Sequence, residues 1–299
     1  MQYDLCCVGH ITLDKVITPR NTVQMPGGTS FYCSEALSLF TDIRYKLITA
    51  LGKSEYPTVE HLREKGVEVE VMPSRHSVYF ENRYGEDQDN RAQRVLAKAD
   101  PFTLDAFRQT EAQIFLLGAL LADDFSPDIV KSLSGKALVA VDSQGYLREV
   151  RDTRVYPVDW TNKREVLPYI HFLKVNEEEM EVLTGYKDIR HAARLLYEWG
   201  VREVLITMGS RGSVLYDGRQ FYSIPAYEAD KVLDATGCGD TYFTGYLYQR
   251  SKGTGMEQSG HFGAAMATLK IERIGPFSGT KGEVLRKMET ARKRWPEKP

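Results

Sequence analysis

The sequence predicts an α/β fold: a three-layer α/β/α sandwich with a mostly parallel central sheet. Short apolar runs recur along the chain and are separated by segments with helical spacing, as in right-handed βαβ units. The strand-like runs cover residues 5–8, 46–51, 114–117, 137–141, 171–175 and 204–207. Several of these runs are apolar throughout, which is typical of parallel strands that have helices on both faces.

The clearest helical pattern lies at residues 188–199, where apolar side chains recur on one face. Asp188 stands where an N-cap residue is expected, and Gly200 stands just past the last periodic position. This segment therefore predicts an amphipathic helix that packs on the sheet.

Two regions, about residues 11–26 and 67–95, interrupt the alternation of strands and helices. Both are polar and rich in strand-forming residues, and residues 85–90 supply turn chemistry within the second. We expect them to pair as a small β-sheet lid, inserted discontinuously into a single domain of residues 1–299. Because open strand edges tend to pair with other strands, the lid also predicts a homodimer formed through it.

The composition is typical of a soluble globular protein and gives no sign of a nucleic-acid or membrane partner. A net charge of −2 and a pI near 6.3 give no basic surface for nucleic acid or anionic membrane. No signal peptide is evident, and the longest apolar runs are too short to span a bilayer. The four cysteines form no C-x-x-C pair, so we expect reduced thiols and a cytoplasmic location.

The strongest local signal is the sequence D-A-T-G-C-G-D at residues 234–240. Gly237 and Gly239 permit backbone conformations and close approaches that other residues do not. A helix that starts at about Gly239 would direct free N–H groups and its positive dipole end at an anion. Asp240 in the first turn suits a base that takes a proton from an attacking hydroxyl. Taken alone, the same pattern would also fit a simple helix cap.

Three further motifs accompany this one. They are Gly27-Gly28-Thr29-Ser30, the Asn176-x-x-Glu179 pair after an apolar run, and the glycine turn at residues 207–212. In this order the four motifs resemble the ribokinase, or PfkB, family of carbohydrate kinases, whose signature near the C-terminus is D-T-x-G-x-G-D. The resemblance covers about residues 3–280 and implies a ribokinase-like fold. No Walker-type phosphate loop occurs.

The resemblance implies a kinase that uses ATP and Mg²⁺. Asp240 would be the general base, and the N–H groups of Gly237, Cys238 and Gly239 would stabilise the transferring phosphoryl group. Asn176 and Glu179 would position Mg²⁺, although Asn followed by Glu three residues later also fits a capping box.

For the nucleotide, the resemblance implies contacts from Thr207, Gly209 and Gly212 as well as Asn176. A hairpin turn is an equally good interpretation of the two glycines. Lys174 lies at a strand end and could either reach a phosphate or serve the structure alone.

For the acceptor, the family pattern implies contacts from Asp14, Gly27 and Gly28. An asparagine that often follows the double glycine is absent here, and the sequence Gly-Gly-Thr-Ser-Phe is similar to an inositol-kinase-like sub-branch. The acceptor is therefore expected to be a small sugar or cyclitol. Further candidate contacts are Asn82, Gln144 and Arg148.

Two other functions remain open at this point. A nucleoside kinase shares the fold and the G-x-G-D chemistry, and Phe31, Tyr32 and Tyr79 could stack on a base. A catalytically silent sugar- or nucleotide-binding protein would also keep the fold, although the intact Asp240 and its glycines argue against it.

Overall fold

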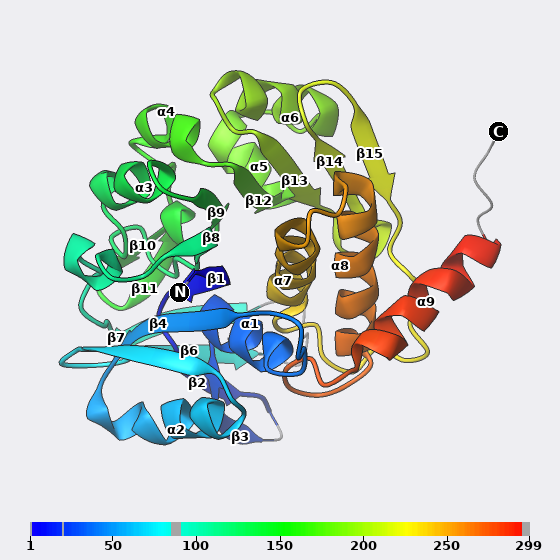
Figure 1. The fold of residues 1–299 in the computed structure, drawn as a ribbon. Coiled ribbons are helices and arrows are strands. Elements are labelled where there is room, and N and C mark those ends of the chain that lie inside the picture. The colour runs from blue at the N-terminus through cyan, green and yellow to red at the C-terminus, as the bar shows by residue number, and fades with distance from the viewer. Residues whose placement is uncertain (1, 20, 85–90, 295–299) are drawn as a thin grey trace.

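The computed structural model describes residues 2–19, 21–84 and 91–294. Within them a nine-stranded sheet has the order β15-β14-β13-β12-β9-β8-β1-β4-β5 (Figure 1). Its strands are β1 (Tyr3–Val8), β4 (Tyr45–Leu51), β5 (Glu68–Pro73), β8 (Ala112–Leu117), β9 (Leu138–Asp142), β12 (Phe172–Asn176), β13 (Glu203–Thr207), β14 (Ser213–Tyr216) and β15 (Phe221–Ile224). All pairings are parallel except those of β14 with β13 and with β15.

Helices cover both faces of this sheet (Figure 1). One face carries α1 (Thr29–Leu37), α2 (Tyr56–Glu64), α7 (Cys238–Ser251), α8 (Met256–Ile271) and α9 (Lys281–Arg294). The other carries α3 (Pro127–Ser134), α4 (Lys163–Val166), α5 (Glu177–Thr184) and α6 (Ile189–Glu198). Neighbouring residues of β1 enter different cores: Cys7 packs with α1 and α7, and Cys6 packs with α3. The predicted three-layer sandwich is confirmed.

Helix α6 begins and ends as its sequence predicts. The side chain of Asp188 accepts a hydrogen bond from the backbone N–H of His191 at 2.6 Å. Gly200 has a φ of 107°, a conformation that favours glycine after a helix. Ala192, Ala193 and Leu196 are buried against the sheet.

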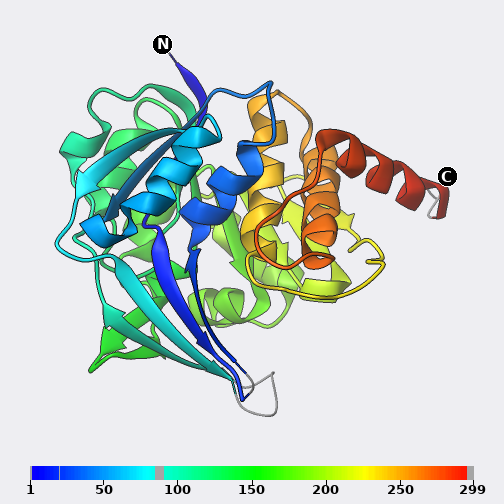
Figure 2. The same cartoon turned by 90° about the horizontal axis from the view of Figure 1, so that it is seen from below.

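A second sheet of six strands, with the order β10-β11-β7-β6-β2-β3, forms the lid and extends away from the body of the molecule (Figure 2). Its strands are β2 (Thr12–Ile17), β3 (Thr22–Gly27), β6 (Val78–Tyr84), β7 (Arg91–Ala97), β10 (Arg148–Arg151) and β11 (Arg154–Pro157). The expected turn at residues 85–90 lies outside the described residues.

The predicted boundaries of the lid differ from this structure at two places. Residues 68–73 were expected in the lid but form β5, which pairs in parallel with β4 at the edge of the main sheet. In β5 Glu68 and Glu70 are exposed and Val69 is buried, so this strand alternates and lacks the apolar run that marks the central parallel strands. The hairpin of β10 and β11 also joins the lid, next to β7, and was not expected there.

The parallel strands place their carboxyl ends at one edge of the main sheet. The register pairs Lys174 with Asp142, and Asn176 with Thr207, so these residues lie side by side at that edge. In open α/β sheets ligands bind at the carboxyl ends of the strands. Of the helices in the part of the chain that is described, none is long and apolar enough to cross a membrane.

Candidate active site

The predicted anion-binding turn leads directly into α7. Gly237 is the N-cap residue and has a φ of 74°, and a Cβ there would lie 2.5 Å from the ring of Tyr32. Glycine is therefore required for both conformation and space. The N–H of Gly239 has no hydrogen-bond acceptor among the described residues. Cys238 differs from expectation, because its N–H donates to the carbonyl of Ala235 at 3.2 Å and closes the turn.

Asp240 lies in the first turn of α7, where it is partly buried. The hydroxyl of Thr29, the first residue of α1, donates to Asp240 Oδ1 at 2.6 Å. Burial and the neighbouring carboxylate of Asp142 raise the pKa of Asp240, against the opposing effects of Lys174 and the Thr29 hydrogen bond. The carboxyl group thus has a fixed orientation and an enhanced affinity for a proton.

Lys174 forms a buried ion pair with Asp142 at the strand ends. Its Nζ lies 2.6 Å from Asp142 Oδ2, and the two residues are only 6% and 3% exposed. Burial lowers the pKa of Lys174, but the carboxylates of Asp142, Glu179 and Asp240 outweigh it and raise the pKa overall. A Cβ on Gly239 would lie 3.4 Å from Lys174 Nζ, so the ammonium group adjoins the anion-binding turn.

Asn176 and Glu179 form the capping box of α5. Asn176 Oδ1 accepts from the Glu179 N–H at 2.8 Å, and Glu179 Oε2 accepts from the Asn176 N–H at 2.8 Å. Glu179 Oε1 accepts from the Asn176 amide at 3.0 Å. Both carboxylate oxygens are thus already engaged, which fits a hold on Mg²⁺ through its water shell better than direct ligation. Among the described residues, no group of three or more His, Cys, Asp or Glu could hold a metal ion.

Thr207, Gly209 and Gly212 lie where β13 turns into β14. The Met208 N–H donates to the Gly212 carbonyl at 2.8 Å, so the segment is a hairpin turn, one of the two interpretations of its sequence. Gly209 and Gly212 have φ values of 57° and 88°. A Cβ on Gly212 would meet the Ile224 carbonyl, whereas one on Gly209 would meet nothing within 4 Å. Thr207, two residues before Gly209, is the register partner of Asn176.

Asp14, Gly27 and Gly28 come together where the lid joins α1. Asp14 Oδ1 accepts from the Thr12 hydroxyl at 2.7 Å. A Cβ on Gly27 would lie 2.6 Å from Asp14 Oδ2, so glycine leaves room for that carboxylate. Gly28 has a φ of 88° and precedes Thr29, which in turn contacts Asp240. The double glycine therefore connects the lid to the candidate base.

Asn82 lies in β6 of the lid, opposite Gln93 of β7. The Gln93 side-chain amide donates to Asn82 Oδ1 at 2.9 Å, and Asn82 is buried. Gln144 and Arg148 lie outside β6 and β7. They flank the short helical turn at Gly145–Leu147 that leads into β10. The charge of Arg148 acts on the carboxylates of Asp240 and Glu179, so it faces the strand ends.

Sequence reasoning did not assign two residues at this edge. Thr29 orients Asp240, and Asp142 compensates Lys174. Thr29 stood within the Gly-Gly-Thr-Ser motif, and Asp142 is the last residue of β9, two residues before the candidate Gln144. Their partners are 211 and 32 residues away, so only the fold reveals the contacts.

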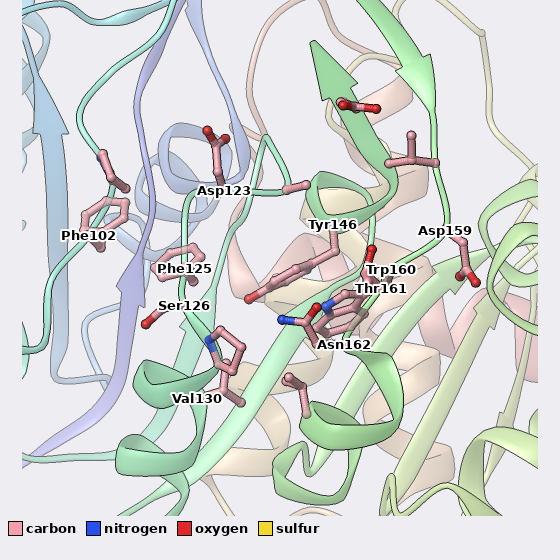
Figure 3. A pocket seen from close by; sticks show the side chains of 16 residues that line it. Phe102, Asp123, Phe125, Ser126, Val130, Tyr146, Asp159, Trp160, Thr161 and Asn162 are labelled. Atoms are coloured by element: carbon pink, nitrogen blue, oxygen red, sulfur yellow. The ribbon is translucent and has the colours of Figure 1, made fainter. Parts of the chain in front are cut away.

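A separate cavity of about 630 Å³ lies behind the turn at Gly145–Leu147 and has none of the predicted site residues in its lining (Figure 3). Tyr146 lies in it against Trp160, with ring centroids 3.9 Å apart, and Phe125 and Asn162 lie beside them (Figure 3). The cavity is mainly aromatic and apolar and belongs to the α3–α6 side of the sheet. The chemistry-bearing groups are therefore gathered at the strand ends and not there.

Comparison with known proteins agrees with this arrangement. The family model for pfkB family carbohydrate kinases matches residues 2–281. The cytidine kinase of Thermococcus kodakarensis is 26% identical over 287 residues, covering 93% of this chain and 99% of that protein. A pyrophosphate-dependent kinase of the ribokinase family, solved with a pyrophosphate analog and myo-inositol, has a TM-score of 0.85 and 27% identity over 94% of this chain and 99% of its own.

A third similar structure describes a double substitution that converts a pyrophosphate-dependent myo-inositol-1 kinase into a myo-inositol-3 kinase. It has a TM-score of 0.84 and 25% identity, and covers 96% of this chain and 99% of its own. Kinases of this family typically use ATP with Mg²⁺, and the pyrophosphate-dependent kinase described above differs in its donor. The chain belongs to the pfkB family of carbohydrate kinases, and it is a carbohydrate or nucleoside kinase with a ribokinase-like fold.

Proposed function

We propose that this kinase transfers the γ-phosphoryl group of ATP to a hydroxyl of a small sugar or cyclitol, with Asp240 as the general base. The observation that carries the proposal is the position of Asp240. This carboxylate has a raised pKa, is oriented by Thr29, and stands in the first helical turn beside a glycine turn with a free N–H. A raised pKa brings a carboxylate closer to the value that suits a base near neutral pH.

In the proposed mechanism, Asp240 accepts the proton of the acceptor hydroxyl as its oxygen forms a bond to the γ-phosphorus. The bond from that phosphorus to the leaving ADP oxygen breaks in the same step. Negative charge on the transferring phosphoryl is stabilised by the N–H groups of Gly237 and Gly239 and by the N-terminal end of α7. Lys174, which adjoins Gly239, adds positive charge. Positioning and charge stabilisation account for most of the rate in such transfers.

The donor would lie along the ends of β12 and β13, with Thr207, Gly209 and Gly212 beside the nucleotide. Asn176 and Glu179 would hold Mg²⁺ through water, and Mg²⁺ when bound neutralises charge on the donor phosphates. Pyrophosphate is a second candidate donor, because a similar structure is of a pyrophosphate-dependent kinase. The anion-binding turn would serve either donor, since both present a terminal phosphoryl group.

The acceptor would lie between the lid and the strand ends, in contact with Asp14, Asn82, Gln144 and Arg148, where Gly27 and Gly28 allow the backbone to approach. The lid pair of Asn82 and Gln93 is a candidate determinant of which acceptor hydroxyl is phosphorylated. In the related myo-inositol kinase, the two positions whose substitution changes the phosphorylated hydroxyl stand eleven residues apart, as Asn82 and Gln93 do.

A nucleoside is the second candidate acceptor, on the strength of the cytidine kinase relative. Stacking of a base would need an exposed aromatic face. Phe31 and Tyr32 are only 5% and 3% exposed and pack in the core, which leaves Tyr79 of the lid as the aromatic side chain among those three that is partly open. The buried rings favour the cyclitol. A homodimer through the lid and a cytoplasmic location remain predictions.

The test is product formation by the purified chain with Mg·ATP or Mg·pyrophosphate against a panel of cyclitols, sugars and nucleosides. We expect turnover with ATP and a cyclitol, and a loss of about 10²–10⁴-fold in kcat for Asp240→Asn. Donor binding should be unchanged in this variant, because its amide has nearly the shape of the carboxylate. Turnover of a nucleoside alone would refute the acceptor assignment, and a fully active Asp240→Asn variant would refute the assignment of the base.

A further inference from the structure

Lys270 carries a charged group into the core of the molecule. It lies in the last turn of α8 and is 0% exposed. Its Nζ donates to the backbone carbonyl of Asp234 at 2.8 Å and to Asp234 Oδ2 at 2.9 Å. An isolated ammonium group in an apolar environment is strongly destabilising, so both bonds to Asp234 are needed to keep it there.

Asp234 in turn fastens the start of the anion-binding turn. Its Oδ1 accepts from the Thr236 N–H at 2.9 Å, and its Oδ2 accepts from the Gly275 N–H at 3.1 Å. Although burial alone would raise it, the bonds from Lys270 and Thr236 hold the pKa of Asp234 below its usual range. The Asp234 carboxylate is therefore the point at which α8, the segment after α8 and the turn meet.

The turn itself has few other contacts that could fix it. Ala235 and Thr236 are exposed, and Gly237 follows with its left-handed backbone. The Leu233 N–H donates to the Ile271 carbonyl at 2.9 Å, again at the end of α8. A site that stabilises a transition state must be held to within roughly 0.5 Å, which exposed residues of a glycine turn do not achieve alone.

We propose that Lys270 is a positioning residue for phosphoryl transfer: its ammonium group acts as a built-in cation that holds the anion-binding turn at the end of α8. This inference rests on the proposed role of that turn. It assigns to Lys270 an effect on kcat, exerted through Asp234 and without contact to substrate. Because the cation is part of the chain, turnover should not respond to added ammonium ions.

The test compares Lys270→Ala and Lys270→Met with the unaltered chain. Displacement of catalytic groups by about 1 Å can lower rates by about 10²-fold, so we expect a loss of that order in kcat with little change in the KM of the acceptor. The truncated side chain of Lys270→Ala leaves space at Asp234. Ammonium or ethylammonium chloride at constant ionic strength should therefore raise the kcat of this variant at least tenfold. The Met variant fills that space and should not be rescued.

A matched control is Lys287→Met, which breaks the ion pair of Lys287 with Glu272 at 2.8 Å near the same helix end. It should lose stability without losing kcat. If the Lys270→Ala variant does not fold, the Asp234→Asn variant is tested in its place. Its amide keeps one oxygen acceptor but removes the negative charge that holds the ammonium group.

The possible results separate this inference from the proposed function. Wild-type kcat in a folded Lys270→Met variant overturns the inference, and so does a loss of activity that no amine restores and that follows the loss of folded protein. Neither result bears on the proposed role of Asp240 as the base. An active Asp240→Asn variant, in contrast, overturns the proposed function whatever Lys270 does.

Discussion

The buried ion pair of Lys174 and Asp142 provides a quantitative test of the charge arrangement around Asp240. Its atoms are 2.6 Å apart, and the two side chains are 7% and 4% exposed. Removal of one partner of a buried pair leaves an uncompensated charge and costs about 3–5 kcal/mol of stability. Lys174→Met leaves three carboxylates facing one another, so its loss of stability should be near the upper end of this range. The loss of stability in Asp142→Asn should be near the lower end of the range, because Lys174 still faces Glu179 and Asp240.

The same two variants should move the titration of Asp240 in opposite directions. Lys174 lowers the pKa of Asp240 and Asp142 raises it, so Lys174→Met should raise that pKa and Asp142→Asn should lower it. A base must be ionised to accept a proton, and kcat/KM therefore falls on the acid side through the pKa of the free enzyme. In profiles of kcat/KM against pH, the acid limb should move to higher pH in Lys174→Met and to lower pH in Asp142→Asn.

Shifts of the acid limb in the same direction, or none in either variant, would refute the assignment of Asp240 as the titrating base. The double variant should lose much less stability than the sum of the single ones, as determined by urea denaturation. Lys98→Met is the control, since Lys98 pairs with Asp123 at 2.6 Å on the surface, with side chains 41% and 67% exposed. It should cost at most about 1 kcal/mol and leave the pH profile unchanged.

Three further results are expected. Replacing Asn82 and Gln93 together by Leu should change which acceptor hydroxyl is phosphorylated, as determined by NMR of the product; an unaltered product at unaltered kcat/KM would contradict a role for the lid pair. Gly237→Ala should abolish most activity because of Tyr32, whereas Gly253→Ala, at a φ of 75° with nothing within 4 Å, should cost only about 1–2 kcal/mol and keep kcat. The folded state raises the pKa of Asp240, so its ionisation destabilises the fold as pH rises above the ordinary Asp range; Asp240→Asn should raise the melting temperature at pH 8 but not at pH 4.

The strands and the anion-binding turn could be predicted because their signals are local. A buried parallel strand reads as an apolar run, and a left-handed N-cap such as Gly237 requires glycine. The strands β10 and β11 carry no such signal. Half of their residues are charged and all are at least partly exposed, and what makes them strands is their pairing with each other and with β7. The bonds of Asp240 to Thr29 and of Lys270 to Asp234 likewise depend on which elements the fold brings together.

The division between body and lid explains why the type of reaction can be recognised more readily than the acceptor. In the proposed mechanism Asp240, Lys174 and the glycine turn act on the phosphoryl group, which is the same for every acceptor, and their positions are set by the ends of the main sheet and by α7. In the proposed function the acceptor would instead be bound by side chains of β2 and β6, on a sheet that extends from the body (Figure 2). The kinase solved with myo-inositol and the cytidine kinase are 27% and 26% identical to this chain, so overall identity does not discriminate between their acceptors. The proposed acceptor contacts from the lid, Asn82 among them, are where the two acceptors would be distinguished, because a buried polar group that the wrong acceptor leaves without a hydrogen bond costs about 1–3 kcal/mol.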